Sequence, residues 1–154
     1  NGMIEYNEDI ALNFIIKNVG SELADNVSIQ ITSDDEYIEI TDASEDIGSM
    51  EAGQEITVDQ AFSFSVPLNI PDEHQINFTF SATNGSDVWE SDFSLTAYAP
   101  KLDFSLISFT ETNGNGNGYL DPGETATARF TAINNGHADF PAGLSTLTAN
   151  SSYI

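Results

Sequence analysis

The chain is short and strongly acidic: its 154 residues include 25 Asp and Glu against three Lys and Arg, a formal net charge of −22. This charge repels the phosphates of nucleic acids and anionic lipid surfaces, so the expected partners are cations, basic surfaces or neutral molecules. The absence of cysteine excludes disulfides, thiolate metal sites and cysteine nucleophiles, and two histidines leave little room for a histidine-based metal site or a catalytic triad.

Hydrophobic residues make up 40% of the chain, which is enough for a core. No apolar run approaches the roughly 18 residues that a membrane span needs, so we expect no membrane insertion. The first residues show no basic segment followed by an apolar one, so no signal peptide is expected there. An acidic composition rich in Ser, Thr and Asn and poor in Lys favours an extracellular or cell-surface location.

Short runs of alternating apolar and polar residues dominate the first hundred positions. They are residues 12–17, 27–32, 38–40, 62–66, 76–81 and 93–97. This period of two is typical of half-buried strands, and turn-forming pairs such as Ala52-Gly53 and Asn84-Gly85 separate the runs. Residues 1–99 are therefore predicted to form an Ig-like antiparallel β-sandwich, with Trp89 and the phenylalanines in its core.

A second part of the chain begins near Pro100. Proline lacks the amide hydrogen that a central strand needs, so Ala99-Pro100-Lys101 interrupts the pattern and marks a domain boundary. Strands are then expected at 102–109 and 126–132, on either side of a glycine-rich stretch. Residues 100–154 are interpreted as a second Ig-like unit.

The second part repeats the beginning of the first at a spacing of 116 positions. Residues 117–154 align on residues 1–38 without a gap, and about nine of the 38 positions are identical. The matches include Asn-Gly, Glu, Phe, the Asn-x-Gly turn and, at the end, Tyr153-Ile154 on Tyr37-Ile38. A period of this length is typical of an array of domains, so we expect tandem sandwiches of which the second copy is truncated. Its unpaired strand edges could pair with a neighbouring domain or a second copy.

The repeat junction carries the spacing of a calcium loop. Residues 113–124 read Asn-Gly-Asn-Gly-Asn-Gly-Tyr-Leu-Asp-Pro-Gly-Glu, which places oxygen ligands at positions 1, 3, 5, 7, 9 and 12 and glycine at position 6. Calcium binds six to eight hard oxygen atoms, and glycine permits the positive φ angles that such a loop requires. The predicted ligands are Asn113, Asn115, Asn117, the carbonyl of Tyr119, Asp121 and Glu124.

Two features set this loop apart from an EF-hand. Positions 1, 3 and 5 are Asn rather than Asp, so Asp121 and Glu124 carry the charge and a weak affinity of about 10⁻⁴–10⁻³ M is expected. The flanking segments are predicted to be strands rather than helices. The alternative is an Asn-Gly hairpin tip without metal, because Asn-Gly is a strong turn former. Glu111 lies just outside the loop and could add charge, and the first copy begins inside its own loop, so no complete site is expected there.

Other polar residues receive weaker functional interpretations. The acidic stretch from Asp34 to Asp46 is interpreted as a solvated sheet rim, with a second cation site as the alternative. His74 and His137 lie in turns and are interpreted as structural or exposed. No nucleophile-elbow, zincin or phosphate-loop motif occurs, so no enzymatic activity is expected.

Two segments resemble Ig-like repeat modules of large secreted bacterial surface proteins. They are Asn-Gly-Asn-Gly-x-Leu-Asp-Pro-Gly-Glu (115–124) with Asn134-Asn135-Gly136, and Ile70–His74 leading into 76–80. The modules are similar to those that follow gingipain-like cysteine peptidases and to CARDB-type adhesion modules. The resemblance implies a calcium-stabilised sandwich in a multi-domain protein, with any peptidase residues in a separate domain.

Three functions remain open on these grounds. The first is a non-catalytic, calcium-stabilised spacer in a secreted or cell-surface protein, with neighbouring domains of the same polypeptide as its partners. The second is an adhesin or ligand-binding module for a protein or glycan, which an exposed aromatic patch near Tyr37, Trp89 or Tyr98 would favour. The third is an accessory domain of a gingipain-like peptidase.

Overall fold

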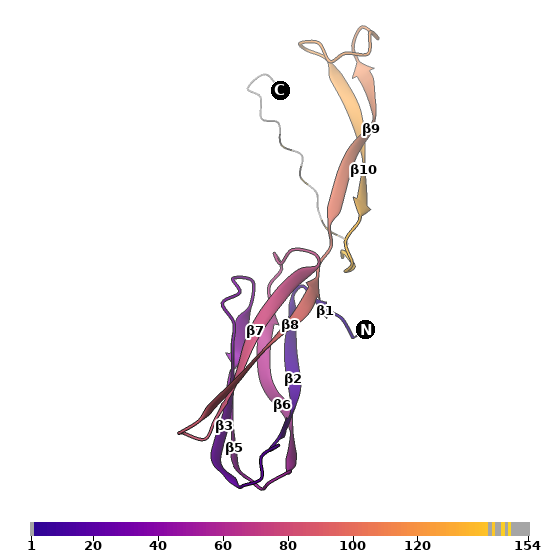
Figure 1. Cartoon of the computed structure of the whole chain (residues 1–154). Coiled ribbons are helices and arrows are strands. Elements are labelled where there is room, and N and C mark those ends of the chain that lie inside the picture. The colour runs from indigo at the N-terminus through magenta and orange to yellow at the C-terminus, as the bar shows by residue number, and fades with distance from the viewer. Residues whose placement is uncertain (1, 142, 144–145, 147, 149–154) are drawn as a thin grey trace. The chain divides into compact units, whose positions relative to one another are not determined.

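The computed structural model describes residues 2–141, 143, 146 and 148, and every regular element among them is a β-strand (Figure 1). None of these residues therefore belongs to a helix that could cross a membrane. The chain divides into two compact units. The first comprises the residues up to Lys101 together with Gly136–Ala138, and the second begins at Leu102.

The larger sheet of the first unit has five strands in the order β1-β8-β7-β3-β5. These strands are β1 (Ile4–Glu5), β8 (Val88–Tyr98), β7 (His74–Thr83), β3 (Ala24–Thr32) and β5 (Ser44–Met50). All neighbours are antiparallel except β1, which pairs with β8 in parallel. The hairpin of β7 and β8 turns at Asn84-Gly85, where Gly85 has a φ of 86° that favours glycine.

The smaller sheet has three antiparallel strands in the order β2-β6-β4. They are β2 (Glu8–Lys17), β6 (Glu55–Val66) and β4 (Glu39–Asp42). Exposure alternates residue by residue along β2, because successive side chains of a strand point to opposite faces. The inward faces of the two sheets form one core whose largest fully buried side chains are Phe62, Phe64, Phe78, Ile29, Ile31 and Ile76. The predicted all-β antiparallel sandwich is confirmed.

Trp89 corrects one part of that prediction. The phenylalanines of β6 and β7 fill the core, but Trp89 is 51% exposed. It lies at the beginning of β8 and pairs with Ala82, one pair before the turn of the β7–β8 hairpin. Its partner Ala82 is buried, so Trp89 lies on the inward face but at an end of the strand where its ring is not covered.

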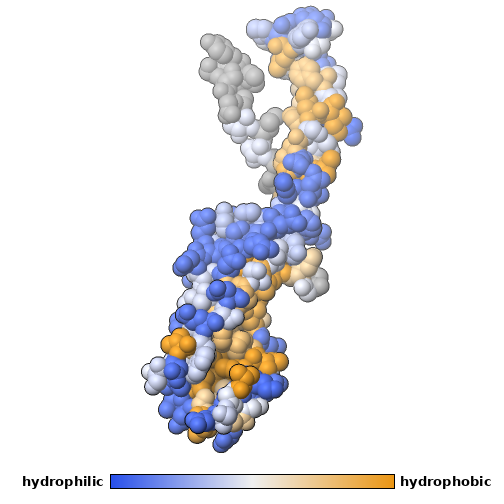
Figure 2. Space-filling model, viewed as in Figure 1, coloured by the Kyte–Doolittle hydropathy of each residue, from blue (hydrophilic) through white to orange (hydrophobic). Residues whose placement is uncertain are grey.

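The second unit contains an antiparallel ribbon of two strands, β9 (Leu102–Asn113) and β10 (Thr125–Asn134). A two-stranded ribbon cannot bury a face, and its apolar side chains are largely exposed (Figure 2). The exposed members are Phe104, Leu106, Ile107, Phe109, Phe130 and Ile133.

Some backbone features recur at the spacing of 116 positions predicted from the sequence. Moved back by 116 positions, β10 falls on residues 9–18, within one residue of β2. The left-handed residues also recur: Gly118 has a φ of 81° and its counterpart Gly2 of 84°, while Gly123 has 88° and its counterpart Asn7 has 60°. The Tyr153-Ile154 match lies outside the described residues.

Replacement of a core phenylalanine should destabilise the first unit strongly. Phe64 is fully buried and its ring lies 5.2 Å from that of Phe78, so Phe64→Ala removes apolar contacts and leaves a cavity. We expect a loss of about 3–5 kcal/mol in the free energy of unfolding, measured by urea denaturation with far-UV circular dichroism. Val88→Ala, at a position that is 64% exposed, should change the free energy of unfolding by less than about 0.5 kcal/mol. Equal losses in the two variants would contradict this packing.

Candidate calcium loop and the environment of the histidines

The predicted calcium loop is the tip of the β9–β10 ribbon. Pairing of Thr125 with Asn113 and of Ala126 with Glu111 closes the ribbon beneath it. Gly116 and Gly118 adopt φ angles of 77° and 81°, so the chain can curl back between the two strands.

Two carboxylates order this loop by accepting hydrogen bonds from its backbone N–H groups. Glu111 accepts from Gly116 N at 2.6 Å through one oxygen and from Gly118 N at 2.7 Å through the other. Glu124 likewise accepts from Asn115 N at 2.8 Å and from Asp121 N at 2.9 Å. The two acids therefore hold the loop from opposite strands.

The amide side chains converge on the third acid. Asn115 Nδ2 and Asn117 Nδ2 donate to the same oxygen of Asp121, at 3.0 and 2.8 Å. The Asn115 and Asn117 Oδ1 atoms accept from the backbone N–H groups two residues further on, those of Asn117 and Tyr119. Four of the six predicted ligands are thus linked to one another: Asn115, Asn117, Asp121 and Glu124. Asn113 ends β9 at the base of the loop, and Tyr119 enters the network through its amide nitrogen.

Glu111 is the member that the twelve-residue motif does not contain. It lies two residues before the first motif position, and the strand register brings it to the loop. Gly114 lies between the two glutamates: a Cβ there would come within 2.7 Å of Glu111 Oε2 and 2.8 Å of Glu124 Oε1. A larger residue here would therefore displace the carboxylate of Glu111 or Glu124 from its place in the loop.

One hydrogen bond of the loop recurs in the first copy. Glu5 N donates to Glu8 Oε2 at 2.9 Å, just as Asp121 N donates to Glu124 Oε2 at 2.9 Å, and these residues are 116 positions apart. The final Glu of the motif and its counterpart Glu8 thus accept the same backbone hydrogen bond.

His137 lies in the first unit and is bound to the loop before β7. Asp72 accepts from His137 Nδ1 at 2.9 Å, and His137 Nε2 lies 3.8 Å from Glu73 Oε1. The partial burial of Asp72 would raise the pKa of its carboxyl, but hydrogen bonds from the His137 ring and from the Ala99 and His137 amides outweigh it and lower that pKa. The hydrogen bond to Asp72 and the attraction of both acids raise the pKa of His137 above 6.5.

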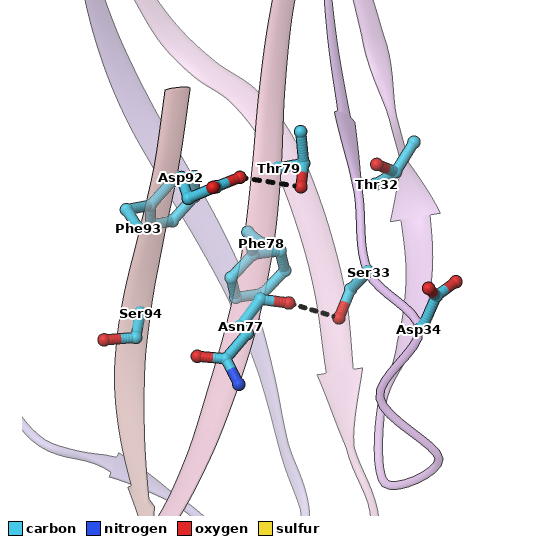
Figure 3. Close-up of a pocket in the computed structure, with 9 residues that line it drawn as sticks. All are labelled: Thr32, Ser33, Asp34, Asn77, Phe78, Thr79, Asp92, Phe93 and Ser94. Atoms are coloured by element: carbon cyan, nitrogen blue, oxygen red, sulfur yellow. Dashed lines mark hydrogen bonds between the residues drawn. The ribbon is translucent and has the colours of Figure 1, made fainter. Parts of the chain in front are cut away.

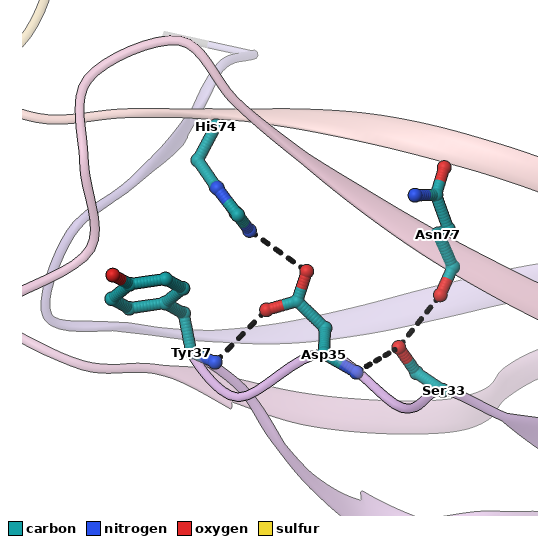
Figure 4. A network of polar contacts seen from close by, with 5 residues as sticks. All are labelled: Ser33, Asp35, Tyr37, His74 and Asn77. Atoms are coloured by element: carbon teal, nitrogen blue, oxygen red, sulfur yellow. Dashed lines mark hydrogen bonds and ion pairs between the residues drawn. The ribbon is translucent and has the colours of Figure 1, made fainter.

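His74 belongs to a separate polar network (Figure 4). Its Nε2 lies 2.7 Å from Asp35 Oδ2, while the other Asp35 oxygen accepts from Tyr37 N at 2.9 Å. Ser33 Oγ accepts from Asp35 N at 3.2 Å and donates to the Asn77 carbonyl at 2.6 Å, which ties the segment to β7. Asp35 of the acidic stretch therefore fixes the connection between β3 and β4.

Two depressions mark the first unit. One, of about 550 Å³, is a polar groove over β3, β7 and β8, where Thr79 donates to Asp92 at 2.9 Å (Figure 3). The other, of about 500 Å³, is mainly apolar and opens where β2 and β5 end and β8 begins. Its lining includes Ile16, Met50, Phe80 and the exposed Trp89.

Comparison with known proteins gives a family and little else. No curated protein matches the chain. Among solved structures, the CsuC–CsuE chaperone–tip adhesion subunit pre-assembly complex from the archaic chaperone-usher Csu pili of Acinetobacter baumannii matches with 13% identity and a TM-score of 0.34, over 86% of this chain and 84% of that one. A likeness at that score carries no argument about fold or function. Residues 3–99, more than half of the chain, match the family model described as a domain of unknown function, DUF8453, and the chain therefore belongs to this family.

Proposed function

We propose that the chain is a non-catalytic, calcium-stabilised spacer module of a larger secreted or cell-surface protein. The observation that carries the proposal is the loop at residues 111–124, where three carboxylates and two asparagine side chains gather on a glycine-rich turn. Carboxylate and amide oxygens are the ligands that Ca²⁺ prefers in proteins.

Calcium would reduce the repulsion among the negative charges of this loop. Glu111, Asp121 and Glu124 bring three negative groups into one short turn, and their mutual repulsion opposes its ordering. A divalent cation would neutralise most of this charge. Asn115 and Asn117 would have to turn their side-chain oxygens, in place of their nitrogens, toward the ion.

The affinity expected for such a site suits an extracellular medium. Three carboxylates and neutral amides bind more weakly than the acid-rich loops of cytosolic calcium buffers, so a dissociation constant of about 10⁻⁴–10⁻³ M is expected. A site of this affinity stays filled only where calcium is abundant. The net charge of −22 would keep a series of such modules soluble and apart from one another.

Calcium should therefore change the loop, and Glu124 should be required. In ¹H–¹⁵N spectra, titration with CaCl₂ is expected to shift the amides of Gly114, Gly116 and Gly118 with a midpoint of about 0.1–1 mM. Glu124→Gln should raise this midpoint beyond the titrated range, whereas Glu22→Gln, an exposed acid of the first unit, should leave it unchanged. Unshifted glycine amides at several millimolar calcium would refute the site, as would equal responses of the two variants.

A second candidate, glycan binding, is favoured by the surroundings of Trp89. Its exposed ring borders the apolar pocket, with Asn18, Glu90 and Ser91 also on the lining. A flat aromatic ring beside hydrogen-bonding groups suits the apolar face and the hydroxyls of a neutral sugar. This arrangement would make the module an adhesin rather than a plain spacer.

Trp89 offers a direct test, because it is the single tryptophan of the chain. At least one sugar in a panel of neutral oligosaccharides should change the fluorescence of Trp89 in a saturable way. The immobilised Trp89→Ala variant should then lose binding to that sugar in surface plasmon resonance. Leu68→Ala removes another exposed apolar side chain, 69% exposed and outside the pocket lining, and should bind like the parent. A panel without any saturable response would reject this candidate and leave the spacer proposal intact.

A further inference from the structure

The segment Gly136–Ala138 docks closely on the first unit. Ala138 is buried, with 2% exposure, and its backbone nitrogen donates to the Ala99 carbonyl oxygen at 3.5 Å. A Cβ on Gly136 would lie 2.3 Å from Ala99 O and 2.4 Å from Lys101 N. Only glycine permits so close a backbone approach, so this docked position is built into the sequence.

Asp72 is the anchor of the docked segment. Its side chain is only 9% exposed, and one oxygen accepts from both Ala99 N and His137 N at 3.1 Å. The other oxygen faces His137 Nδ1 at 2.9 Å. The Asp72 carboxylate thus joins Ala99, which follows β8, to His137, which is 65 residues from Asp72 in the sequence.

His137 has an acid at each ring nitrogen. Asp72 faces Nδ1, Glu73 Oε1 lies 3.8 Å from Nε2, and the Tyr98 ring packs beside the imidazole at 5.5 Å between centroids. Asp139 is the nearest charged residue along the chain, and the backbone nitrogen of Lys101 lies next to Gly136. A neutral imidazole has one N–H and can serve one of these acids, whereas the imidazolium donates from both nitrogens.

The same three side chains have ligand atoms within 4.8 Å of one another, a spacing that a metal ion could also use. A metal would take one imidazole nitrogen and draw both carboxylates to that side of the ring. Asp72 and Glu73 instead face different nitrogens, and two backbone amides hold Asp72 in its orientation. A proton on the ring fits this geometry better than a metal ion does.

We propose that Asp72, Glu73 and the segment Gly136–Ala138 form a proton-controlled latch, which the charged His137 holds closed and which loosens when the ring loses its proton. The segment follows β10 by one residue, so a closed latch ties the chain to the first unit after the ribbon as well as before it. In the aligned first copy the counterparts of Gly136 and His137 are Gly20 and Ser21, so the glycine recurs but the proton-binding residue belongs to the second copy alone.

The sign of the pH dependence follows from the two pKa shifts. The raised pKa of His137 makes its contribution complete below the ordinary value of 6.5 and lost as the pH rises through the raised pKa. The lowered pKa of Asp72 makes its contribution complete above 3.8 and lost as the pH falls through the lowered pKa. The latch is therefore tightest in mild acid and opens toward alkaline pH.

Hydrogen exchange and histidine titration by NMR test this latch on the whole chain. Between about pH 5 and pH 9, His137 should titrate above 6.5, and the protection factor of the Ala138 amide should fall as it does so. Asp72→Asn keeps an acceptor oxygen of the same shape but no charge, so the pKa of His137 should return toward 6.5 and the protection should lose its pH dependence. His137→Gln should abolish the dependence in the same way, while the exposed Glu36→Gln serves as the unaltered control.

Three results would overturn the proposal. The first is a pKa of His137 at or below 6.5, and the second is protection of Ala138 that stays constant across the pH range in the parent protein. The third comes from titration with ZnCl₂ near neutral pH: stoichiometric binding that removes the His137 titration, and that Asp72→Asn abolishes, would make the trio a metal site. Unchanged His137 signals with zinc support the latch.

Discussion

The burial of one apolar face of each sheet against the other is the constraint on which the first unit depends. A strand offers only alternate residues to the core, and here β6 and β7 supply the phenylalanines that meet between the sheets, such as Phe64 and Phe78 at 5.2 Å. The core of the described residues contains apolar side chains only. Polar chemistry is therefore placed where strands end, and each candidate site lies at a turn or at the beginning or end of a strand.

The acids at these ends share one structural task. Asp72, Glu111 and Glu124 each accept at least two hydrogen bonds from backbone N–H groups in connections that lack regular pairing. Hydrogen bonds to a charged acceptor are stronger than those between neutral groups. These three acids thus order connections that have no regular strand pairing.

Alternation in the sequence predicted eight of the ten strands that the described residues form, and the sandwich, because period two follows directly from strand geometry. It missed β5, because the sequence Ser-Glu-Asp-Ile-Gly-Ser-Met shows no alternation of apolar and polar residues. It could not predict β1, since two residues carry no period and their parallel pairing with β8 joins distant parts of the chain. Nor could it place Trp89, because alternation tells which face a residue occupies but not how far along the strand the opposing sheet extends.

In the loop, too, the sequence spacing identified the residues that lie close together in the chain but not those that strand pairing brings there. The twelve-residue spacing identified Asn115, Asn117, Asp121 and Glu124, which the structure links by hydrogen bonds. Glu111 becomes a full member only through the register of β9 on β10, and Asp72 meets His137 across 65 residues. Contacts of this kind leave no local pattern in a single sequence.

The ribbon of β9 and β10 has a colloidal consequence. It exposes Phe104, Ile107 and Phe130 along strands whose edges can pair, on a molecule of net charge −22. Like-charged molecules are held apart over about a Debye length, close to 10 Å at 0.1 M salt and near 3 Å at 1 M. Ionic strength therefore sets how closely two such ribbons approach. At high salt the screened repulsion lets the exposed apolar side chains of two molecules come into contact, whereas in dilute buffer it keeps them apart.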